Sequence, residues 1–417
     1  MKRNRWLIAL SAIFIHLSIG SVYAYSVFQT PLRDELGWDG TTVTVAFTIA
    51  IFFLGTSAAF FGKFVEKRGP RVSAFVAAVL FSSGLIGTGL SIGAGSLYGF
   101  YVTYGVIGGF GLGIGYIAPV STLVKWFPDR RGLATGMAVF GFGAGSLIAS
   151  PVAAQLIETI GLTTTFYLLG GTYFILMALG AVYITRPPEG WMPASQKEET
   201  DDGKLEEKED LSQLTANEAI KTKRFWLLWW MMFINISAGI MLIAVASPMA
   251  QETVGMTAIT AATMVGVMGL FNGGGRIAWA SFSDYIGREN IYLLFFIVQL
   301  VAFFILPWIT NAILFQIVMY LIVSMYGGGF ASLPAFIGDL FGTKQLGAIH
   351  GYLLTSWALA GVVGPLIVSS IRETMGSYDS AFYIFAGLLA SALGASLLMK
   401  RDIKGIQKEK LILADQR

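Results

Sequence analysis

Residues 258–282 read AITAATMVGVMGLFNGGGRIAWASF, and Arg276 is the one charged side chain in this apolar run. A run of this length crosses a bilayer as a helix, because about 20 apolar residues span the hydrocarbon core. An arginine at mid-helix depth costs roughly 2.5–3.5 kcal/mol and usually faces a polar cavity with a partner. All 25 Asp and Glu fall in loops, tails or helix ends, so no membrane carboxylate is an obvious partner. We infer that the partner of Arg276 is an anionic ligand.

Similar apolar runs occupy most of the 417-residue chain, which is 55% hydrophobic and 13% charged, with a mean hydropathy of +0.68. A soluble domain usually carries about 25% charged residues. The runs lie near 6–28, 42–61, 72–93, 97–124, 133–157, 163–185, 225–247, 258–282, 290–309, 312–337, 346–370 and 378–399. The sequence therefore predicts an all-α membrane protein with twelve transmembrane helices.

The positive charges predict the orientation of this bundle. If Lys2 and Arg3 mark one side, 25 of the 28 Lys and Arg lie there, while Arg33 and Arg372 lie opposite and Arg276 lies between. The positive-inside rule then places both termini in the cytoplasm of a multi-pass cell-membrane protein. The chain has no cysteine, which excludes disulfides and thiolate metal sites. No metal and no cofactor is expected.

The chain also repeats itself at an offset of 214–218 residues. The matched pairs are Gly69 with Gly287, Pro119 with Pro334, Gly132 with Gly347, and Pro151 with Pro365. This pattern predicts two six-helix pseudo-repeats. The expected parts are an N-terminal bundle at 1–185, a cytoplasmic linker at 186–223, a C-terminal bundle at 224–400 and a cytoplasmic tail at 401–417. The charged linker is expected to be a solvated tether with a surface helix near 214–219.

Two loops carry a recognisable signature. The first has Gly62, Glu66, Gly69 and Arg71, and the second has Asp284, Gly287 and Arg288. Together they resemble the loop signature of the major facilitator superfamily, and the resemblance covers essentially the whole chain. It implies the major facilitator fold, and it implies that Glu66, Arg71, Asp284 and Arg288 form a conformational latch. A purely topological role for these charges is the alternative.

Three further stretches resemble the oxalate/formate antiporter and monocarboxylate transporter branch: 125–134 (KWFPDRRGLA), 222–229 (TKRFWLLW) and 272–276 (NGGGR). In that branch a helix-8 arginine binds the substrate carboxylate, and the resemblance places this role on Arg276. The oxalate carrier has a lysine where this chain has Trp357. One cation suits a monoanion, because a second carboxylate buried without a partner would cost several kcal/mol. The resemblance with this departure predicts a monocarboxylate substrate and disfavours oxalate.

Other residues are expected beside Arg276. Asn272 lies four positions earlier, so both side chains project from one helix face. By resemblance to the oxalate carrier, an aromatic cage is expected from Tyr23, Tyr116, Tyr326, Phe330 and Trp357. A tyrosine ring packs on a small aliphatic body while its hydroxyl donates to a carboxylate. Simple packing is the alternative for each, because the chain contains 16 Tyr, 31 Phe and 10 Trp.

Coupling is left open by the sequence. His16 lies at membrane depth and is a candidate proton-linked residue, with a neutral hydrogen-bonding role as the alternative. The mammalian-type monocarboxylate transporters place an Asp where this chain has Asn272, so their proton relay cannot be carried over unchanged. Coupling could come from His16, from substrate protonation, or from exchange of one anion for another.

Glycines are frequent in the predicted helices but match no nucleotide-binding motif. Gly132-x3-Gly136 and Gly141-Phe-Gly-Ala-Gly145 lie where small residues let helices approach closely. The glycines at 273–275 favour a second hypothesis, in which a thin helix wall lets Arg276 move between two states.

The sequence contains no catalytic set at membrane depth, so the chain is not expected to be an enzyme or to bind nucleic acid. The predicted function is a monomeric secondary transporter of small monocarboxylates, such as lactate, pyruvate or formate, that works by alternating access. One alternative is an oxalate/formate-type anion exchanger. The other is a transporter-like sensor that binds a carboxylate without turnover.

Overall fold

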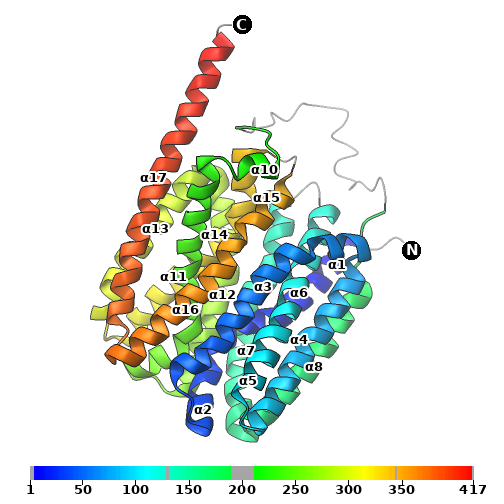
Figure 1. Cartoon of the computed structure of the whole chain (residues 1–417), viewed down its shortest axis with the longest axis vertical. Coiled ribbons are helices and arrows are strands. Elements are labelled where there is room, and N and C mark those ends of the chain that lie inside the picture. Colours follow the sequence, from blue (N-terminus) through cyan, green and yellow to red (C-terminus); the bar gives the residue numbers. More distant parts are fainter. Residues whose placement is uncertain (1–3, 128–130, 189–210, 343–344, 416–417) are drawn as a thin grey trace.

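The computed structural model describes residues 4–127, 131–188, 211–342 and 345–415. Within these ranges all regular structure is helical, and 12 helices are long and apolar enough to cross a membrane. The predicted all-α membrane fold is therefore confirmed. Figure 1 shows the start of α1 (Arg5–Gly20) and the end of α17 (Asp379–Asp415) at the same end of the molecule. We call this end the termini side and the opposite end the far side.

The N-terminal half carries the first six spans. After α1 its elements are η1 (Ser21–Ala24), α2 (Ser26–Leu36), α3 (Gly40–Arg68), α4 (Pro70–Gly93), α5 (Leu97–Phe100), η2 (Tyr101–Ile107), α6 (Gly108–Trp126), α7 (Arg131–Ile160) and α8 (Leu162–Tyr183). The first predicted helix, 6–28, is interrupted by η1, a turn of 3₁₀ helix. This break places Tyr23 on a tightened turn in the middle of the bundle.

The C-terminal half carries the other six spans. Its elements are α10 (Ala216–Ala219), α11 (Lys223–Val254), α12 (Ala258–Ile286), α13 (Arg288–Ile305), η4 (Leu306–Trp308), α14 (Ala312–Phe341), α15 (Leu346–Leu353), α16 (Thr355–Met375) and α17. The predicted tail at 401–417 continues α17 as far as Asp415. Figure 1 shows this helix projecting beyond the bundle.

The end of the linker is attached to the C-terminal half. The residues at 189–210 lie outside the described part of the chain, as do 1–3, 128–130, 343–344 and 416–417. From Leu211 on, the backbone follows the end of α14: the Leu211 N–H donates to the Asp339 carbonyl at 2.9 Å and the Leu214 N–H donates to the Phe341 carbonyl at 2.8 Å. The short helix α10 follows, capped by Thr215, where a surface helix was predicted.

The two halves meet mainly where α7 packs against α12 and α3 packs against α16. Glycine makes this approach possible. A Cβ added to Gly143 would lie 2.8 Å from the Gly273 Cα atom, and a Cβ added to Gly55 would lie 2.9 Å from the Ala358 Cβ atom. Real Cβ atoms do not come this close, so no larger residue fits without moving a helix. The packing role predicted for the glycines of 141–145 is confirmed at Gly143.

Polar contacts join the halves at the far side. Glu252, at the end of α11, accepts from Arg372 Nε at 2.5 Å and pairs with Arg33 Nη1 of the other half at 3.5 Å. The Gly40 N–H donates to Glu373 Oε1 at 2.7 Å. We call these five residues the far-side cluster. Because it links α2 and α3 to α11 and α16, the far side of the molecule is closed.

Candidate anion-binding site

Arg276 lies near the middle of α12 and is fully buried, with 0% of its surface exposed. Its Nε atom donates a hydrogen bond to Oδ1 of Asn272, which lies on the same helix face, at 3.2 Å. The terminal atoms Nη1 and Nη2 have no hydrogen-bond partner among the described residues. A buried charged donor without an acceptor loses its hydration with no compensation. The guanidinium therefore presents an unused two-pronged donor to the interior.

Aromatic rings flank this guanidinium. Its Cζ atom lies 5.3 Å from the ring centre of Phe330 and 5.8 Å from that of Phe142. Rings at this distance attract a cation through their negative faces. Phe142 comes from α7 in the N-terminal half, so Arg276 of the C-terminal half faces both halves. The site lies where they meet.

Two tyrosines bridge the halves beside Arg276. The hydroxyl oxygens of Tyr23 and Tyr326 lie 2.7 Å apart in a hydrogen bond, and both side chains are buried. The rings of Tyr326 and Phe330 pack edge to face at 5.3 Å, and the rings of Tyr23 and Phe142 do so at 5.0 Å. These contacts tie both tyrosines to the rings around the guanidinium.

Trp357 and Tyr116 complete the group. The Trp357 ring centre lies 4.7 Å from that of Phe330, 5.4 Å from that of Tyr116 and 6.0 Å from that of Phe142. The structure thus brings together all seven predicted substrate-binding residues and adds Phe142. We call the six rings of Tyr23, Tyr116, Phe142, Tyr326, Phe330 and Trp357 the aromatic cage.

Phe142 was missed by the sequence prediction. It is the one large side chain in Gly141-Phe-Gly-Ala-Gly145, a run interpreted only as a packing surface. An aromatic residue among glycines that let helices approach closely must itself reach into a neighbouring space, and this signal could have identified it.

His16 lies behind the cage. Its Nε2 atom is 3.0 Å from the backbone carbonyl of Tyr116, and its ring stacks on the Tyr116 ring at 5.4 Å. Since a carbonyl oxygen only accepts, Nε2 carries the proton in this hydrogen bond. The His16 ring also lies edge to face with the Phe142 ring at 6.2 Å, so His16 contacts two rings of the cage.

The predicted latch residues lie at the termini side, away from the cage. Arg288 donates to Asp284 Oδ1 at 2.5 Å and pairs with Asp339 Oδ2 at 3.2 Å, and all three belong to the C-terminal half. Arg71 is exposed at the start of α4. The side chain of Glu66 lies outside the described part of the chain. The structure brings Asp284 and Arg288 together but describes no contact between the two copies of the signature.

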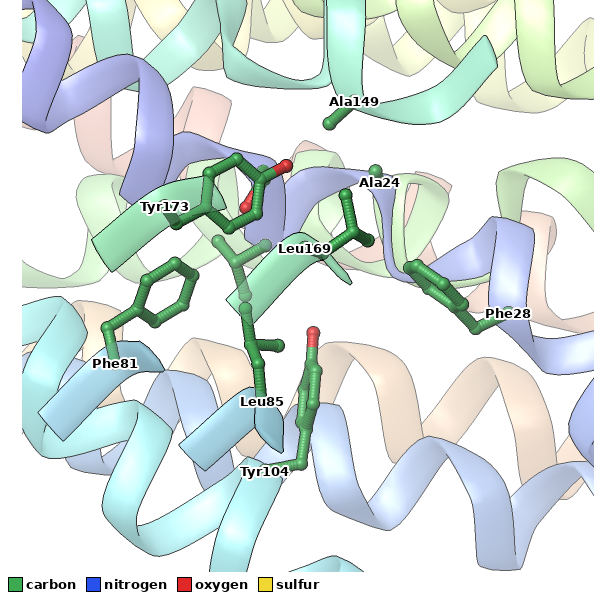
Figure 2. A pocket seen from close by; sticks show the side chains of 10 residues that line it. Ala24, Phe28, Phe81, Leu85, Tyr104, Ala149, Leu169 and Tyr173 are labelled. Carbon is green, nitrogen blue, oxygen red and sulfur yellow. The ribbon is translucent and has the colours of Figure 1, made fainter. Parts of the chain in front are cut away.

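Two of the cavities among the described residues differ in their relation to the site. One, with about 190 Å³ of empty space, is lined by Tyr23, Ser146, Ile243, Val265, Met268, Gly269, Asn272 and Val323, so it lies beside Asn272, toward the far side. The other, with about 330 Å³, lies within the N-terminal half among apolar side chains and the rings of Tyr104 and Tyr173, as Figure 2 shows. It contains none of the predicted site residues. In the described ranges no group of three His, Asp or Glu side chains could hold a metal ion.

Similarity to known proteins covers nearly the whole chain. Residues 8–365 match the family model of the Major Facilitator Superfamily. The chain is 28% identical over 412 residues to the oxalate:formate antiporter of Oxalobacter formigenes, covering 97% of this chain and 94% of that protein. It is 25% identical over 401 residues to monocarboxylate transporter 10 of Homo sapiens, and the match covers 91% of this chain and 75% of that protein. Among solved structures it is similar to a bacterial homolog of the human lysosomal transporter Spinster in an inward-facing and occupied conformation. The TM-score is 0.71 at 14% sequence identity, and the match covers 95% of this chain and 96% of that chain.

Proposed function

Because the chain belongs to the major facilitator superfamily, as its loop signature predicted, we propose that it is a secondary active transporter of small monocarboxylates such as lactate, pyruvate or formate. Its family and fold are those of membrane transporters rather than enzymes. The observation that carries the proposal is the buried guanidinium of Arg276, whose Nη1 and Nη2 lack partners among the described residues. A substrate carboxylate would accept from both nitrogens in the bidentate geometry that arginine favours.

The charge of the cage supports a monoanion. Its six described side chains are neutral aromatic rings, and Arg276 is the one cation beside them. A dianion would leave one carboxylate among rings without a counter-charge, which costs several kcal/mol. The human relative is a monocarboxylate transporter, in agreement with this choice.

A second candidate is an anion exchanger for oxalate-like substrates. The similarity to the oxalate:formate antiporter favours it, while Trp357 at the position of that carrier's lysine opposes it. A carboxylate sensor without turnover is the candidate from another class of proteins. Counterflow separates the sensor from a transporter, since a sensor binds labelled substrate without moving it.

Alternating access follows from the position of the site. Tyr23, Tyr116 and Phe142 belong to one half, and Tyr326, Phe330 and Trp357 to the other. A rocking motion about the α7–α12 and α3–α16 contacts would open the cage to one side and then the other. With the termini side in the cytoplasm, the closed far side faces outward. One chain supplies both walls, so we propose that the monomer is the working unit.

Coupling through His16 would need its Nε2 proton, which in this structure is donated to the backbone carbonyl of Tyr116. Direct proton exchange between His16 and the substrate is thus disfavoured in the closed structure. Substrate entry together with a proton, or exchange of two monoanions, would be electroneutral and needs no titratable group in the cage.

The test is uptake of labelled lactate, pyruvate, formate and oxalate into proteoliposomes, with and without a pH gradient, for wild type and Arg276→Lys. Lysine keeps the charge but loses the planar fork. We expect uptake to fall roughly ten- to hundredfold, because a charge-assisted hydrogen bond contributes about 1.5–3 kcal/mol. Arg401→Lys, on the exposed part of α17, is the matched control and should retain wild-type uptake.

Preferred uptake of oxalate over every monoanion would refute the monocarboxylate assignment. Unchanged uptake by Arg276→Lys would refute the role of the guanidinium.

A further inference from the structure

Trp357 has an unused hydrogen-bond donor. Its side chain is fully buried, with 0% exposure, and its indole Nε1 has no hydrogen-bond partner among the described residues. The indole nitrogen can only donate. A buried donor left without an acceptor costs about 1–3 kcal/mol. The position of this N–H therefore calls for an acceptor from elsewhere.

Five other tryptophans of the chain have an acceptor for the indole N–H. They donate to it at 2.6–3.1 Å: Trp126 to Thr185 O, Trp226 to Ile220 O, Trp229 to Thr355 Oγ1, Trp230 to Ser391 Oγ and Trp279 to Ser324 Oγ. Each of these five is less deeply buried than Trp357. Each of the five has a protein acceptor, while the fully buried indole of Trp357 has none among the described residues.

The unused donor shares its surroundings with Arg276. The Phe330 ring centre lies 5.3 Å from the Arg276 Cζ atom and 4.7 Å from the Trp357 ring centre. The Phe142 ring centre lies 5.8 Å from the Arg276 Cζ atom and 6.0 Å from the Trp357 ring centre. Both donors thus border the same two rings. A ligand whose carboxylate binds Arg276 would lie beside the two rings that Trp357 also contacts.

We propose that the indole N–H of Trp357 donates to an oxygen on carbon 2 of the substrate, so that the site selects 2-oxo and 2-hydroxy monocarboxylates over acids that lack this oxygen. The inference rests on the proposed function and narrows its substrate class. The hydroxyls of Tyr23 and Tyr326 bond to each other, whereas the indole N–H of Trp357 has no hydrogen-bond partner among the described residues.

The chemistry of the donor sets the discrimination. A keto or hydroxyl oxygen has a lone pair for the indole, whereas the ammonium group of a 2-amino acid has none and would add a second cation. Propionate and formate would leave the N–H desolvated and unpaired. Sites that hydrogen-bond a substrate oxygen reject analogues lacking it strongly, because their own polar groups are then left without partners.

The experiment is competition for counterflow of labelled pyruvate in proteoliposomes by unlabelled pyruvate, lactate, propionate and formate. For wild type, we expect propionate to need at least a roughly tenfold higher concentration than pyruvate or lactate, which corresponds to about one lost hydrogen bond. Trp357→Phe keeps a ring in the cage but removes the N–H. In this variant, the ratio of the competing concentration of propionate to that of pyruvate should fall to near one.

Trp230→Phe is the matched control, because its indole bonds to Ser391 outside the cage. It should keep the wild-type preference. Equal competition by propionate and pyruvate in wild type would overturn the inference even if Trp357→Phe failed to fold, and so would a preference that persists in that variant. The proposed function would fail in a different way, with no monocarboxylate exchanged at all.

Discussion

At the scale of single residues, Asn272 decides which nitrogens of Arg276 face the ligand. Its Oδ1 atom accepts from Nε, which fixes the guanidinium and leaves Nη1 and Nη2 for a carboxylate. An amide does this without a charge. A carboxylate at the same place would neutralise the arginine, and the substrate would then have to compete with it.

This argument predicts the effect of Asn272→Asp. We expect uptake at pH 7 to fall at least about tenfold, since the introduced carboxylate pairs with Arg276 and blocks the substrate. The positive charge of Arg276 favours the ionised form of the introduced carboxyl group, so it stays ionised from pH 8 to 5 and the ratio of variant to wild-type uptake should stay low throughout this range. Asn272→Ala is the control: it loses the hydrogen bond but introduces no competing charge, so its uptake should fall less. Equal uptake by Asn272→Asp and Asn272→Ala would contradict the competition.

At the residue level, the sequence is most informative where the physical cost of a residue is large. A charge in an apolar run is conspicuous, so Arg276 and its neighbour Asn272 could be found from spacing alone. The aromatic residues of the cage could be predicted only by resemblance to a family. In the sequence alone, a Tyr or Trp that lines a binding site looks the same as one that faces lipid. The unpaired N–H of Trp357 could not be predicted, since it depends on the absence of an acceptor in three dimensions.

At the scale of elements, the three glycines before Arg276 differ in how closely they approach neighbouring helices. A Cβ on Gly273 would lie 3.0 Å from the Phe140 carbonyl oxygen, and one on Gly275 would lie 2.8 Å from the backbone Cα and C atoms of Ser324, while one on Gly274 meets nothing within 4 Å. Close helix packing therefore requires glycine at Gly273, toward α7, and at Gly275, toward α14, but not at Gly274. The hypothesis that these glycines let Arg276 move stays a prediction.

A pair of neighbouring variants tests this difference. Gly275→Ala should lower the thermal midpoint and the uptake, because it overpacks α12 against α14 at a typical cost of ~1–3 kcal/mol. Gly274→Ala should keep wild-type uptake and be neutral or stabilising, because alanine is the better helix former by up to about 1 kcal/mol. The measurements are thermal unfolding in detergent and uptake in proteoliposomes. Equal effects of the two substitutions would show that the close approach to Ser324 is not limiting.

Hydropathy located every span but not the interruptions and extensions of the helices. The predicted run at 42–61 became α3 (Gly40–Arg68), because a helix continues into its polar last turns while hydropathy detects only the apolar part. Within 6–28, Ser21 donates its hydroxyl to the Ser18 carbonyl at 2.7 Å. Such a side-chain bond competes with helical hydrogen bonding, and here it accompanies the 3₁₀ turn that carries Tyr23.

At the scale of the whole molecule, the two halves could be predicted from the repeat, but their relative position could not. Closure of the far side depends on charges that lie far apart in sequence, namely Arg33 on α2, Glu252 on α11 and Arg372 on α16. Arg372 also lies 5.7 Å from the ring of Tyr378. At the termini side, the pairs of Arg224 with Asp402 and of Arg288 with Asp284 stay within one half. The described ion pairs thus favour a state closed at the far side.

The far-side cluster should therefore control the balance between the two access states. Glu252→Gln removes the charge shared by Arg33 and Arg372 with little change in shape. Partly exposed ion pairs contribute about 0.2–1 kcal/mol each, and a loss of ~1 kcal/mol shifts the ratio of states about fivefold.

Because the chain has no cysteine, spin labels at Glu35→Cys and Met375→Cys, both exposed at the far side, report the distance between the halves directly. We expect Glu252→Gln to increase the population at long distances, and Asp402→Asn, which breaks an ion pair within one half, to leave it unchanged. If the distance distribution of Glu252→Gln matched that of wild type, closure would have to depend on the apolar contacts of α7 with α12 and of α3 with α16, and the charges of the cluster would be dispensable.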